Sequence, residues 1–478
     1  MARKQSDKTQ NSPKTVAVIS LGCPKNTIDS EVMLGHLAKD NFRLVQDASE
    51  AEVVIVNTCG FIEASKKESI DAVLDAAKLR KTGRLKSLVV GGCLAQRYGN
   101  ELKKELPEID ILFGLNDVEN VVNQIQNLPP RHQATKFEKS ESLYSSQSKV
   151  KPSMAHGSFK EATYVYDASS LRLLSTPGHF AYVKISEGCD LPCTFCVIPK
   201  IRGRYRSRAM EDIEQETKNL AEQGVKEVCL VAQDSTWYGA DRYGRPQIAP
   251  LLERLSRVKG LEWVRLHYLY PSRVTDEMLE VMAGHPRIAP YFDVPLQHAS
   301  DRILKSMRRI GGRASLDQLV ARIKSKIPHA SIRSSFIVGY PGETDGDFNE
   351  LLDFLRVSEL DYVGFFSYSQ EDGTPAGLMP HQVPEKIKQA RLAEAFRVQE
   401  TAAEKAHQRW LGQTLTAVVE NVEKGDVQGR TQYQAPEVDG VVLIEELKKP
   451  KVGQWVKVEI THAMKQDLVG KAVLQNKF

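Results

Sequence analysis

The first third of the chain alternates short apolar runs with longer stretches of helical periodicity. Three runs rich in β-branched residues stand at 16–21 (VAVISL), 53–56 (VVIV) and 88–90 (LVV), and a helix-like stretch follows each of them. Apolar runs of this kind are typical of parallel strands buried on both faces, with the helical stretches as crossovers. Residues 14–132 are therefore predicted to form an α/β domain with a doubly wound parallel sheet.

A second series of strand and helix patterns follows a change in composition. Residues 133–177 contain SESLYSSQSKVKPS and show no sustained periodicity, so we interpret them as a linker. Residues 178–410 then alternate strand-like runs with helical stretches such as 210–223 and 347–358. The six predicted strands are 182–186, 227–232, 263–269, 291–295, 331–338 and 362–367. Right-handed crossovers would wrap these units into a partial parallel (βα) barrel, with its chemistry at the carboxyl ends of the strands.

The last segment, residues 411–478, changes to short alternating runs. They stand at 414–419, 441–446, 456–461 and 472–474, separated by turns that contain glycine. That pattern predicts a small antiparallel β-barrel. Modules of this kind often bind nucleic acid through a basic face, but here nine Lys and Arg are balanced by nine Asp and Glu. A segment without net charge does not indicate a surface that follows phosphates.

Composition and charge exclude several classes of protein. The chain has 478 residues, of which 41% are hydrophobic and 26% charged, as in an ordinary globular protein. Its net charge of +4 is too small to indicate nucleic acid binding without a concentrated basic patch. No apolar run approaches the roughly 20 residues of a membrane span, and residues 1–15 lack the apolar stretch of a signal peptide. We therefore expect a cytoplasmic protein without a membrane partner, in which seven cysteines favour metal ligation or catalysis over disulfides.

Three cysteines stand close together directly after the predicted strand 182–186. Cys189, Cys193 and Cys196 lie in EGCDLPCTFCVIP, a C-x3-C-x2-C spacing on a loop that also carries a glycine and a proline. Three thiolates within eight residues can bind one cubane iron–sulfur cluster and leave one iron without a protein ligand. Two alternatives stay open, a zinc site with His179 as a fourth ligand and a set of buried structural thiols.

Three further cysteines recur at equivalent places in the N-terminal units. Cys23, Cys59 and Cys93 each come at or just past the end of one of the first three predicted strands, and each precedes a helical stretch. The carboxyl ends of parallel strands meet at one edge of a sheet, where helix N-termini favour a bound anion. The pattern predicts a second cluster with three protein ligands, the alternative being cysteines that fill core space. Cys229, in the middle of EVCLVAQ, is predicted to be a core residue.

The C-x3-C-x2-C loop, with Phe195 before its last cysteine, on a partial (βα) barrel resembles the radical S-adenosylmethionine enzymes. With the three-cysteine domain before it and a barrel similar to the TRAM module after it, the chain apart from the linker resembles the methylthiotransferases. The resemblance implies two 4Fe-4S clusters, held by the six cysteines, and S-adenosylmethionine as cofactors. One cluster would bind S-adenosylmethionine through its open iron and generate a 5′-deoxyadenosyl radical. The other would carry the sulfur of the transferred methylthio group.

The methylthiotransferases have two branches, one acting on an aspartate of ribosomal protein S12 and one on an adenosine of transfer RNA. The ribosomal-protein branch is the one resembled by the segments RLHYLYPSRVTDEM, YFDVPLQHASDRILKSMRR, SSFIVGYPGET and SYSQEDGTPA. A neutral terminal barrel agrees with this, because a module that docks on a basic ribosomal protein gains nothing from a positive face. The resemblance therefore implies methylthiolation of an aspartate β-carbon in S12, free or on the ribosome, with an electron donor as a further partner.

A radical suits this substrate, because the β-carbon hydrogen of an aspartate is too weakly acidic for a protein base near neutral pH. Two other functions stand as alternatives. The first is methylthiolation of an adenosine in transfer RNA, and the second, from a different class, is a non-catalytic iron–sulfur redox module. Electron carriers seldom leave iron sites open, so three-ligand sites favour catalysis, and cleavage of S-adenosylmethionine would discriminate between the two classes.

Four residues outside the cysteines are candidates for binding the cofactor. Gln233 and Asp234, in VAQDS at a strand end, have side chains that can hydrogen-bond S-adenosylmethionine. Gly339 and Gly342 lie in SFIVGYPGET, a turn that the resemblance places near the adenosyl group, although a turn can need glycine for backbone geometry alone. His298, in LQHAS, is predicted to be a core histidine without a catalytic role.

A basic run follows the C-x3-C-x2-C loop, with a cation at every second position. Its members are Lys200, Arg202, Arg204, Arg206 and Arg208. Such a run is usually a solvated face, but beside a cavity it can contact a substrate or an RNA phosphate. It does not discriminate between the two branches.

Overall fold

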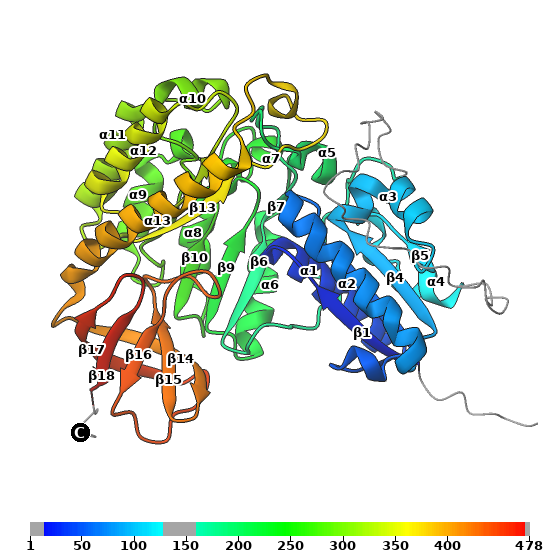
Figure 1. The fold of residues 1–478 in the computed structure, drawn as a ribbon. Coiled ribbons are helices and arrows are strands. Elements are labelled where there is room, and N and C mark those ends of the chain that lie inside the picture. Colours follow the sequence, from blue (N-terminus) through cyan, green and yellow to red (C-terminus); the bar gives the residue numbers. More distant parts are fainter. Residues whose placement is uncertain (1–13, 128–158, 474–478) are drawn as a thin grey trace, which may run out of the picture. The chain divides into compact units, whose positions relative to one another are not determined.

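The computed structural model describes residues 14–127 and 159–473 (Figure 1). The chain divides into two compact units. Unit 1 ends at Tyr164 and also includes Ser170–Leu173, and unit 2 comprises Val165–Ser169 and Leu174–Phe478. Among the described residues, no helix is both long and apolar enough to cross a membrane.

Unit 1 is a five-stranded, fully parallel sheet with the strand order β2-β1-β3-β4-β5, coloured blue to cyan in Figure 1. Its strands are β1 (Thr15–Ser20), β2 (Arg43–Leu44), β3 (Val53–Thr58), β4 (Ser87–Gly92) and β5 (Ile111–Leu112). Its helices are α1 (Pro24–Lys39), η1 (Ala48–Glu50), α2 (Glu63–Thr82), α3 (Cys93–Glu105), η2 (Leu115–Asp117) and α4 (Val121–Gln126). The three predicted apolar runs form β1, β3 and β4, which are neighbours in the sheet, so their carboxyl ends lie side by side.

The first part of unit 2 contains the six predicted parallel strands, arranged as the three-stranded sheets β10-β9-β6 and β11-β12-β13. These strands are β6 (Phe180–Lys184), β9 (Glu227–Val231), β10 (Trp263–Leu266), β11 (Tyr291–Asp293), β12 (Ser331–Val338) and β13 (Tyr362–Ser367). The Leu269 N–H donates to Asp293 O (2.8 Å) and links the two sheets. A partial (βα) barrel is therefore confirmed.

The helices of this barrel lie between its strands and pack on one large apolar core. They are α5 (Ile198–Arg202), α6 (Met210–Glu222), η3 (Ser235–Trp237), α7 (Ala240–Tyr243), α8 (Ile248–Ser256), η4 (Pro271–Arg273), α9 (Asp276–Gly284), α10 (Asp301–Ser306), α11 (Arg313–Lys326), α12 (Asp345–Ser358), η5 (Ala376–Leu378), α13 (Glu385–His407) and η6 (Gln408–Trp410). A short antiparallel pair, β7 (Ser186–Glu187) with β8 (Arg206–Ser207), follows β6.

The C-terminal segment forms a closed five-stranded barrel with the order β14-β15-β16-β18-β17. Its strands are β14 (Thr414–Glu423), β15 (Asp426–Thr431), β16 (Val442–Glu445), β17 (Trp455–Ala463) and β18 (Leu468–Ala472). The predicted small barrel is confirmed, but it is not wholly antiparallel, because β16 and β18 pair in parallel while the other pairs are antiparallel. The strand β15 (DVQGRT) was not predicted, because it lacks an apolar alternation.

Buried charges join this terminal barrel to the amino end of the (βα) barrel. Glu227, the first residue of β9, accepts a hydrogen bond from Arg265 Nε (2.7 Å) and forms an ion pair with Arg430. Arg430 Nε also donates to Glu420 Oε1 (2.7 Å), and Arg265 Nη1 donates to Gln432 O (3.0 Å). Burial acts to raise the pKa of Glu227, but the charges of Arg430 and Arg265 outweigh it and hold that pKa below its usual range.

The loop between β15 and β16 makes a second group of contacts at the same end of the strands. Tyr182 donates to Glu437 Oε2 (2.7 Å), and Tyr291 donates to Asp439 Oδ2 (2.6 Å). Arg333 Nε donates to the other oxygen of Asp439 (3.2 Å). The terminal barrel therefore covers the amino ends of the strands, opposite to the end from which the C-x3-C-x2-C loop departs.

Arg430→Ala is expected to destabilise the contact between the two barrels by about 3–5 kcal/mol. The substitution leaves the buried Glu227 with only one of its two arginine partners, Arg265. Trp263 and Trp455 lie edge to face across the same interface, with ring centroids 4.4 Å apart. Denaturant unfolding followed by tryptophan fluorescence therefore measures the change. Lys448→Ala, at an exposed position of the same barrel, is the control and should unfold like the parent protein. An Arg430→Ala variant as stable as this control would contradict the interpretation.

Candidate active site

The C-x3-C-x2-C loop is held by backbone hydrogen bonds and by a required glycine. The Cys189 N–H donates to Gly203 O (3.1 Å), and the Cys196 N–H donates to Cys193 O (3.2 Å). Gly188 has a φ of +81°, and an added Cβ there would lie 2.0 Å from the carbonyl oxygen of Arg204. Only glycine allows the backbone to enter the loop at this point.

Thr194, between the second and third cysteines of the loop, ties it to three distant segments. Its N–H donates to Met307 O (3.2 Å), and its carbonyl accepts from the Ala376 N–H (2.9 Å). Its hydroxyl lies 2.8 Å from the hydroxyl of Tyr340. Tyr340 belongs to the GYPGET turn, so this turn is hydrogen-bonded to the cysteine loop and holds it in place. Sequence analysis missed Thr194 and Tyr340, whose contact joins residues 146 positions apart.

The three thiols of this loop influence one another electrostatically. Burial raises the pKa of Cys189 to about 11, and the neighbouring Cys193 adds to the rise. Burial raises the pKa of Cys196 to about 12, again with a contribution from Cys193. Buried thiols of this kind become thiolates when a metal supplies the compensating positive charge. The donor set and its setting therefore fit an iron–sulfur cluster.

The zinc alternative with His179 is wrong. His179 precedes β6, whereas the cysteines follow it, and its Nε2 lies 3.3 Å from Glu420 Oε1 at the amino end of the barrel. Within residues 14–127 and 159–473, no three His, Cys, Asp or Glu side chains stand in the arrangement of a single-ion site. A cubane cluster differs from such a site, because its cysteines bind separate irons.

The loops of Cys23, Cys59 and Cys93 lie against one another at the carboxyl edge of the unit 1 sheet. A Cβ added at Gly22, where φ is +89°, would lie 2.9 Å from Cys59 Sγ. A Cβ added at Gly60 would lie 3.1 Å from the carbonyl carbon of Cys93. Glycines thus permit a close approach of the three cysteine loops, as the strand pattern predicts. Cys23 is the N-cap residue of α1, and Cys93 is the first residue of α3.

Two asparagines fix the backbone around this trio, and sequence analysis did not single them out. Asn26 Nδ2 donates to Leu21 O (2.7 Å) and to Asn57 O (3.1 Å), and Asn57 Nδ2 returns a bond to Asn26 O (2.9 Å). Both side chains are buried. They tie the loop after β1 to the end of β3. The sequence offered one indication of this role, because Asn26 follows Cys23 by three residues at the end of a predicted strand.

The structure separates the roles of Gln233 and Asp234. Gln233 Nε2 donates to Glu187 Oε1 (2.5 Å), and its own Oε1 is buried without a hydrogen-bond partner among the described residues. That oxygen remains free to accept from a ligand. The Asp234 carboxylate is occupied, because it accepts from the Thr236 N–H (3.1 Å) and pairs with Arg273 (2.5 Å). Burial raises the pKa of Asp234, although the contacts with Thr236 and Arg273 act to lower it.

Gly339 and Gly342 both have positive φ, of +74° and +78°. The Gly339 N–H donates to Glu343 Oε2 (2.7 Å), and a Cβ at Gly339 would lie 2.3 Å from Lys388 Cγ. At Gly342 the nearest atom to such a Cβ is Arg302 Nη1, at 3.9 Å. Backbone geometry therefore accounts for both glycines, and close packing adds a second reason at Gly339.

The basic run after the cysteine loop is not one solvated face. Arg202 is buried and pairs with Glu187 (2.9 Å), and Arg208 is buried and pairs with Glu216 (2.6 Å). Of the other three, Lys200 and Arg204 are exposed and Arg206 is half-buried. The two buried arginines stabilise the barrel interior. His298 and Cys229 are fully buried, as predicted for core residues.

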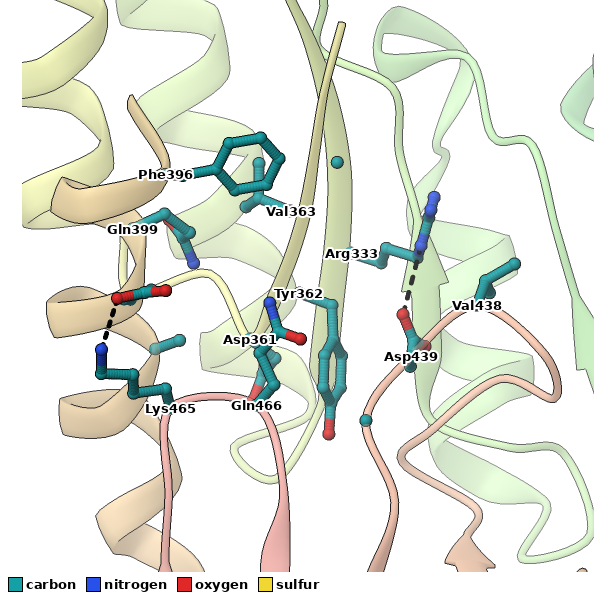
Figure 2. Close-up of a pocket in the computed structure, with 14 residues that line it drawn as sticks. Arg333, Asp361, Tyr362, Val363, Phe396, Gln399, Val438, Asp439, Lys465 and Gln466 are labelled. Atoms are coloured by element: carbon teal, nitrogen blue, oxygen red, sulfur yellow. Dashed lines mark hydrogen bonds and ion pairs between the residues drawn. The ribbon is translucent and has the colours of Figure 1, made fainter. Parts of the chain in front are cut away.

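A groove lies between α13, the start of β13 and the terminal barrel. Figure 2 shows Lys465 at one border and the ion pair of Arg333 with Asp439 (3.2 Å) at the other. Lys465 pairs with Glu400 (2.5 Å). On the (βα) barrel its lining includes Arg333 and Tyr362, near the amino ends of β12 and β13. It therefore lies at the opposite end of the strands from the C-x3-C-x2-C loop, and we assign it no part in the chemistry.

Gly339→Ala is expected to destabilise the protein more than Gly342→Ala. Each alanine in a left-handed conformation costs about 1–2 kcal/mol. At Gly339 the methyl group also displaces Lys388, whose Nζ donates to Tyr368 O (2.8 Å), which adds about 1 kcal/mol. Denaturant titration of both variants measures the difference. Equal stabilities, with loss of S-adenosylmethionine binding only in Gly339→Ala, would instead indicate a direct role in holding the cofactor.

Comparisons with known proteins cover almost the whole chain. Three family models match: "Uncharacterized protein family UPF0004" at residues 15–114, "Radical SAM superfamily" at 183–355 and "TRAM domain" at 411–473. The chain is 44% identical to the ribosomal protein uS12 methylthiotransferase RimO of Desulforamulus reducens, over 96% of this chain and 99% of that protein. It is 42% identical to the RimO of Bdellovibrio bacteriovorus, over 97% and 98% of the two chains.

Among solved structures, the fold is similar to that of a radical S-adenosylmethionine methyltransferase, TsrM of Kitasatospora setae. The TM-score is 0.53 at 15% identity, over 77% of this chain and 74% of that chain. This likeness supports the fold of the cysteine-bearing barrel. The identity and coverage of the sequence relatives go further: the chain belongs to the RimO family of radical S-adenosylmethionine methylthiotransferases.

Proposed function

We propose that this protein transfers a methylthio group to the β-carbon of an aspartate in ribosomal protein uS12. The observation that carries the proposal is a hydrogen-bonded C-x3-C-x2-C loop in a chain that matches uS12 methylthiotransferases over 96% of its length. S-adenosylmethionine is both the source of the radical and the methyl donor. We also propose that the enzyme acts in the cytoplasm, on uS12 that is free or in the ribosome, with a separate electron donor.

Cys189, Cys193 and Cys196 would hold one 4Fe-4S cluster. When bound, this cluster supplies an electron to the sulfonium of S-adenosylmethionine and so provides the radical that abstracts the hydrogen. The protein contributes position. Thr194, which is 2% exposed, and Tyr340 fix the loop, and the buried Gln233 Oε1 is an acceptor for a donor group of S-adenosylmethionine.

Cys23, Cys59 and Cys93 would hold the second 4Fe-4S cluster, from which the sulfur is delivered. The 16-residue helix α1 begins directly after Cys23, and α3 begins at Cys93. The amino ends of these helices carry partial positive charge, which favours an anionic cluster. The glycines beside Cys23 and Cys59 let the loops approach closely enough to share it.

The two alternative functions are less well supported. The terminal barrel is bound to the (βα) barrel through its main buried cation, Arg430, so it offers still less positive charge to transfer RNA. The relatives with which the chain was compared above carry the name of the uS12 enzyme. A redox module without catalysis has no use for an iron without a protein ligand.

The test of substrate is the mass of uS12 from cells with and without the gene, with thiomethylated transfer-RNA nucleosides measured in parallel. We expect uS12 to lose the mass of one sulfur and one methylene on deletion, while the nucleosides stay unchanged. Loss of the nucleoside with unchanged uS12 would place the enzyme in the transfer-RNA branch.

Cysteine substitution separates the two clusters. Replacing Cys189, Cys193 and Cys196 together by Ala is expected to remove about half of the bound iron and to abolish reductive cleavage of S-adenosylmethionine. Replacing Cys23, Cys59 and Cys93 is expected to remove the other half but to leave that cleavage in place. Iron and sulfide analysis and detection of 5′-deoxyadenosine are the measurements.

The buried Cys229→Ala is the matched control and should keep both clusters. A full iron content in either triple variant would show that the cysteines concerned are not the ligands.

A further inference from the structure

Arg309 places a cationic hydrogen-bond donor beside one sulfur of the C-x3-C-x2-C loop. Its Nη1 lies 3.8 Å from Cys193 Sγ, within the range of an N–H···S hydrogen bond. The two residues come from separate parts of the barrel, the cysteine from the loop after β7 and the arginine from the turn after α10. Cys193 is half-buried, so the contact is shielded from much of the solvent.

The guanidinium of Arg309 is fixed on several sides. Its Nη2 donates to Pro295 O (2.7 Å), and its Cζ lies 4.2 Å from the ring centroid of Tyr270. The Arg309 backbone N–H donates to Leu304 O (2.9 Å). The side chain is thus held toward the cysteine by partners outside the C-x3-C-x2-C loop, and little further ordering is needed to form the bond.

Arg309 differs from its neighbour Arg273 in its charge balance. Arg273 also stacks near Tyr270, but it pairs with the carboxylate of Asp234 at 2.5 Å. No carboxylate of the described residues lies within ion-pair distance of Arg309. Its positive charge is therefore not neutralised locally and acts on Cys193.

We propose that Arg309 raises the reduction potential of the cluster held by Cys189, Cys193 and Cys196, through its hydrogen bond and charge at the Cys193 sulfur. This inference rests on the proposed function of that loop. A cluster bound by three thiolates becomes more negative when it accepts an electron, so a fixed cation and N–H donor stabilise the reduced form more than the oxidised form. The electron comes from an external one-electron reductant. Arg309 is a positioning residue, because it acts through a ligand and not on the substrate.

The test is a potentiometric titration of the reconstituted full chain, followed by electron paramagnetic resonance, in Arg309→Gln and Arg308→Gln. Both changes remove one positive charge from adjacent positions, but Arg308 is exposed, and within the described part of the chain its side chain forms no hydrogen bond or ion pair with the cysteines. We expect Arg309→Gln to bind a full complement of iron and to shift its midpoint to a more negative potential. At a fixed solution potential the ratio of reduced to oxidised cluster should fall about fivefold, which corresponds to about 1 kcal/mol, because only the part of the hydrogen-bond and charge stabilisation that differs between the two oxidation states is lost. Arg308→Gln should titrate like the parent protein.

Arg309→Lys provides a second variant. It keeps the charge but loses the planar fork that bridges Pro295 and Cys193, so its midpoint should fall between those of the parent and Arg309→Gln. Unchanged midpoints in both Arg309 variants, with iron bound, would overturn the inference and leave the proposed function intact. A parent protein that binds no iron at the C-x3-C-x2-C loop would instead overturn the proposed function, and the inference with it.

Discussion

Parallel strands bring all of their carboxyl ends to one edge of a sheet and all of their amino ends to the other. In the (βα) barrel this constraint separates the contacts that hold the terminal barrel from the loop that carries the three cysteines. At the amino edge, Glu227 is shared by Arg265 and Arg430, and these charges fasten the terminal barrel. At the carboxyl edge, the loop of three cysteines departs after β7. Because the charges of the amino edge are paired inside the protein, the groups available for chemistry lie at the other edge.

The ionic contact at the amino edge joins two domains at a large cost in desolvation free energy. Arg265 and Arg430 are 0% and 1% exposed, so each loses its hydration and must recover that free energy from fixed partners. An apolar interface would give comparable stability but would tolerate sliding, whereas the planar fork of an arginine accepts only one orientation of its carboxylate. The gain is one defined position of the terminal barrel on the strands. In that position the terminal barrel also places Asp439 against Arg333 of β12, with the carboxylate fully buried.

Strand polarity also explains which parts of the site could be predicted from the sequence. The position of the cysteines at the carboxyl ends of strands could be predicted, because it depends only on the local apolar pattern and on the topology. The buried role of Arg202 and Arg208 could not be predicted, since their partners Glu187 and Glu216 lie 15 and 8 residues away and the run itself resembles a solvated face. The strand β15 was missed for a related reason: its residues DVQGRT take their extended conformation from pairing with β14 and β16, and not from an apolar alternation.

If each cysteine set holds a cluster, as proposed, the two sets meet the same electrostatic requirement by different means. An anionic cluster needs nearby positive charge, and in unit 1 the backbone provides it, because α1 starts at the residue after Cys23 and α3 starts at Cys93. Such partial charges belong to the fold and do not depend on side-chain identity. The loop of Cys193 has no such helix of comparable length, since α5 is five residues long, and a side chain from the turn after α10 takes that place. A side-chain charge can be changed by one substitution without altering the backbone, so the electron-accepting site is the one whose properties the sequence can adjust independently of the fold.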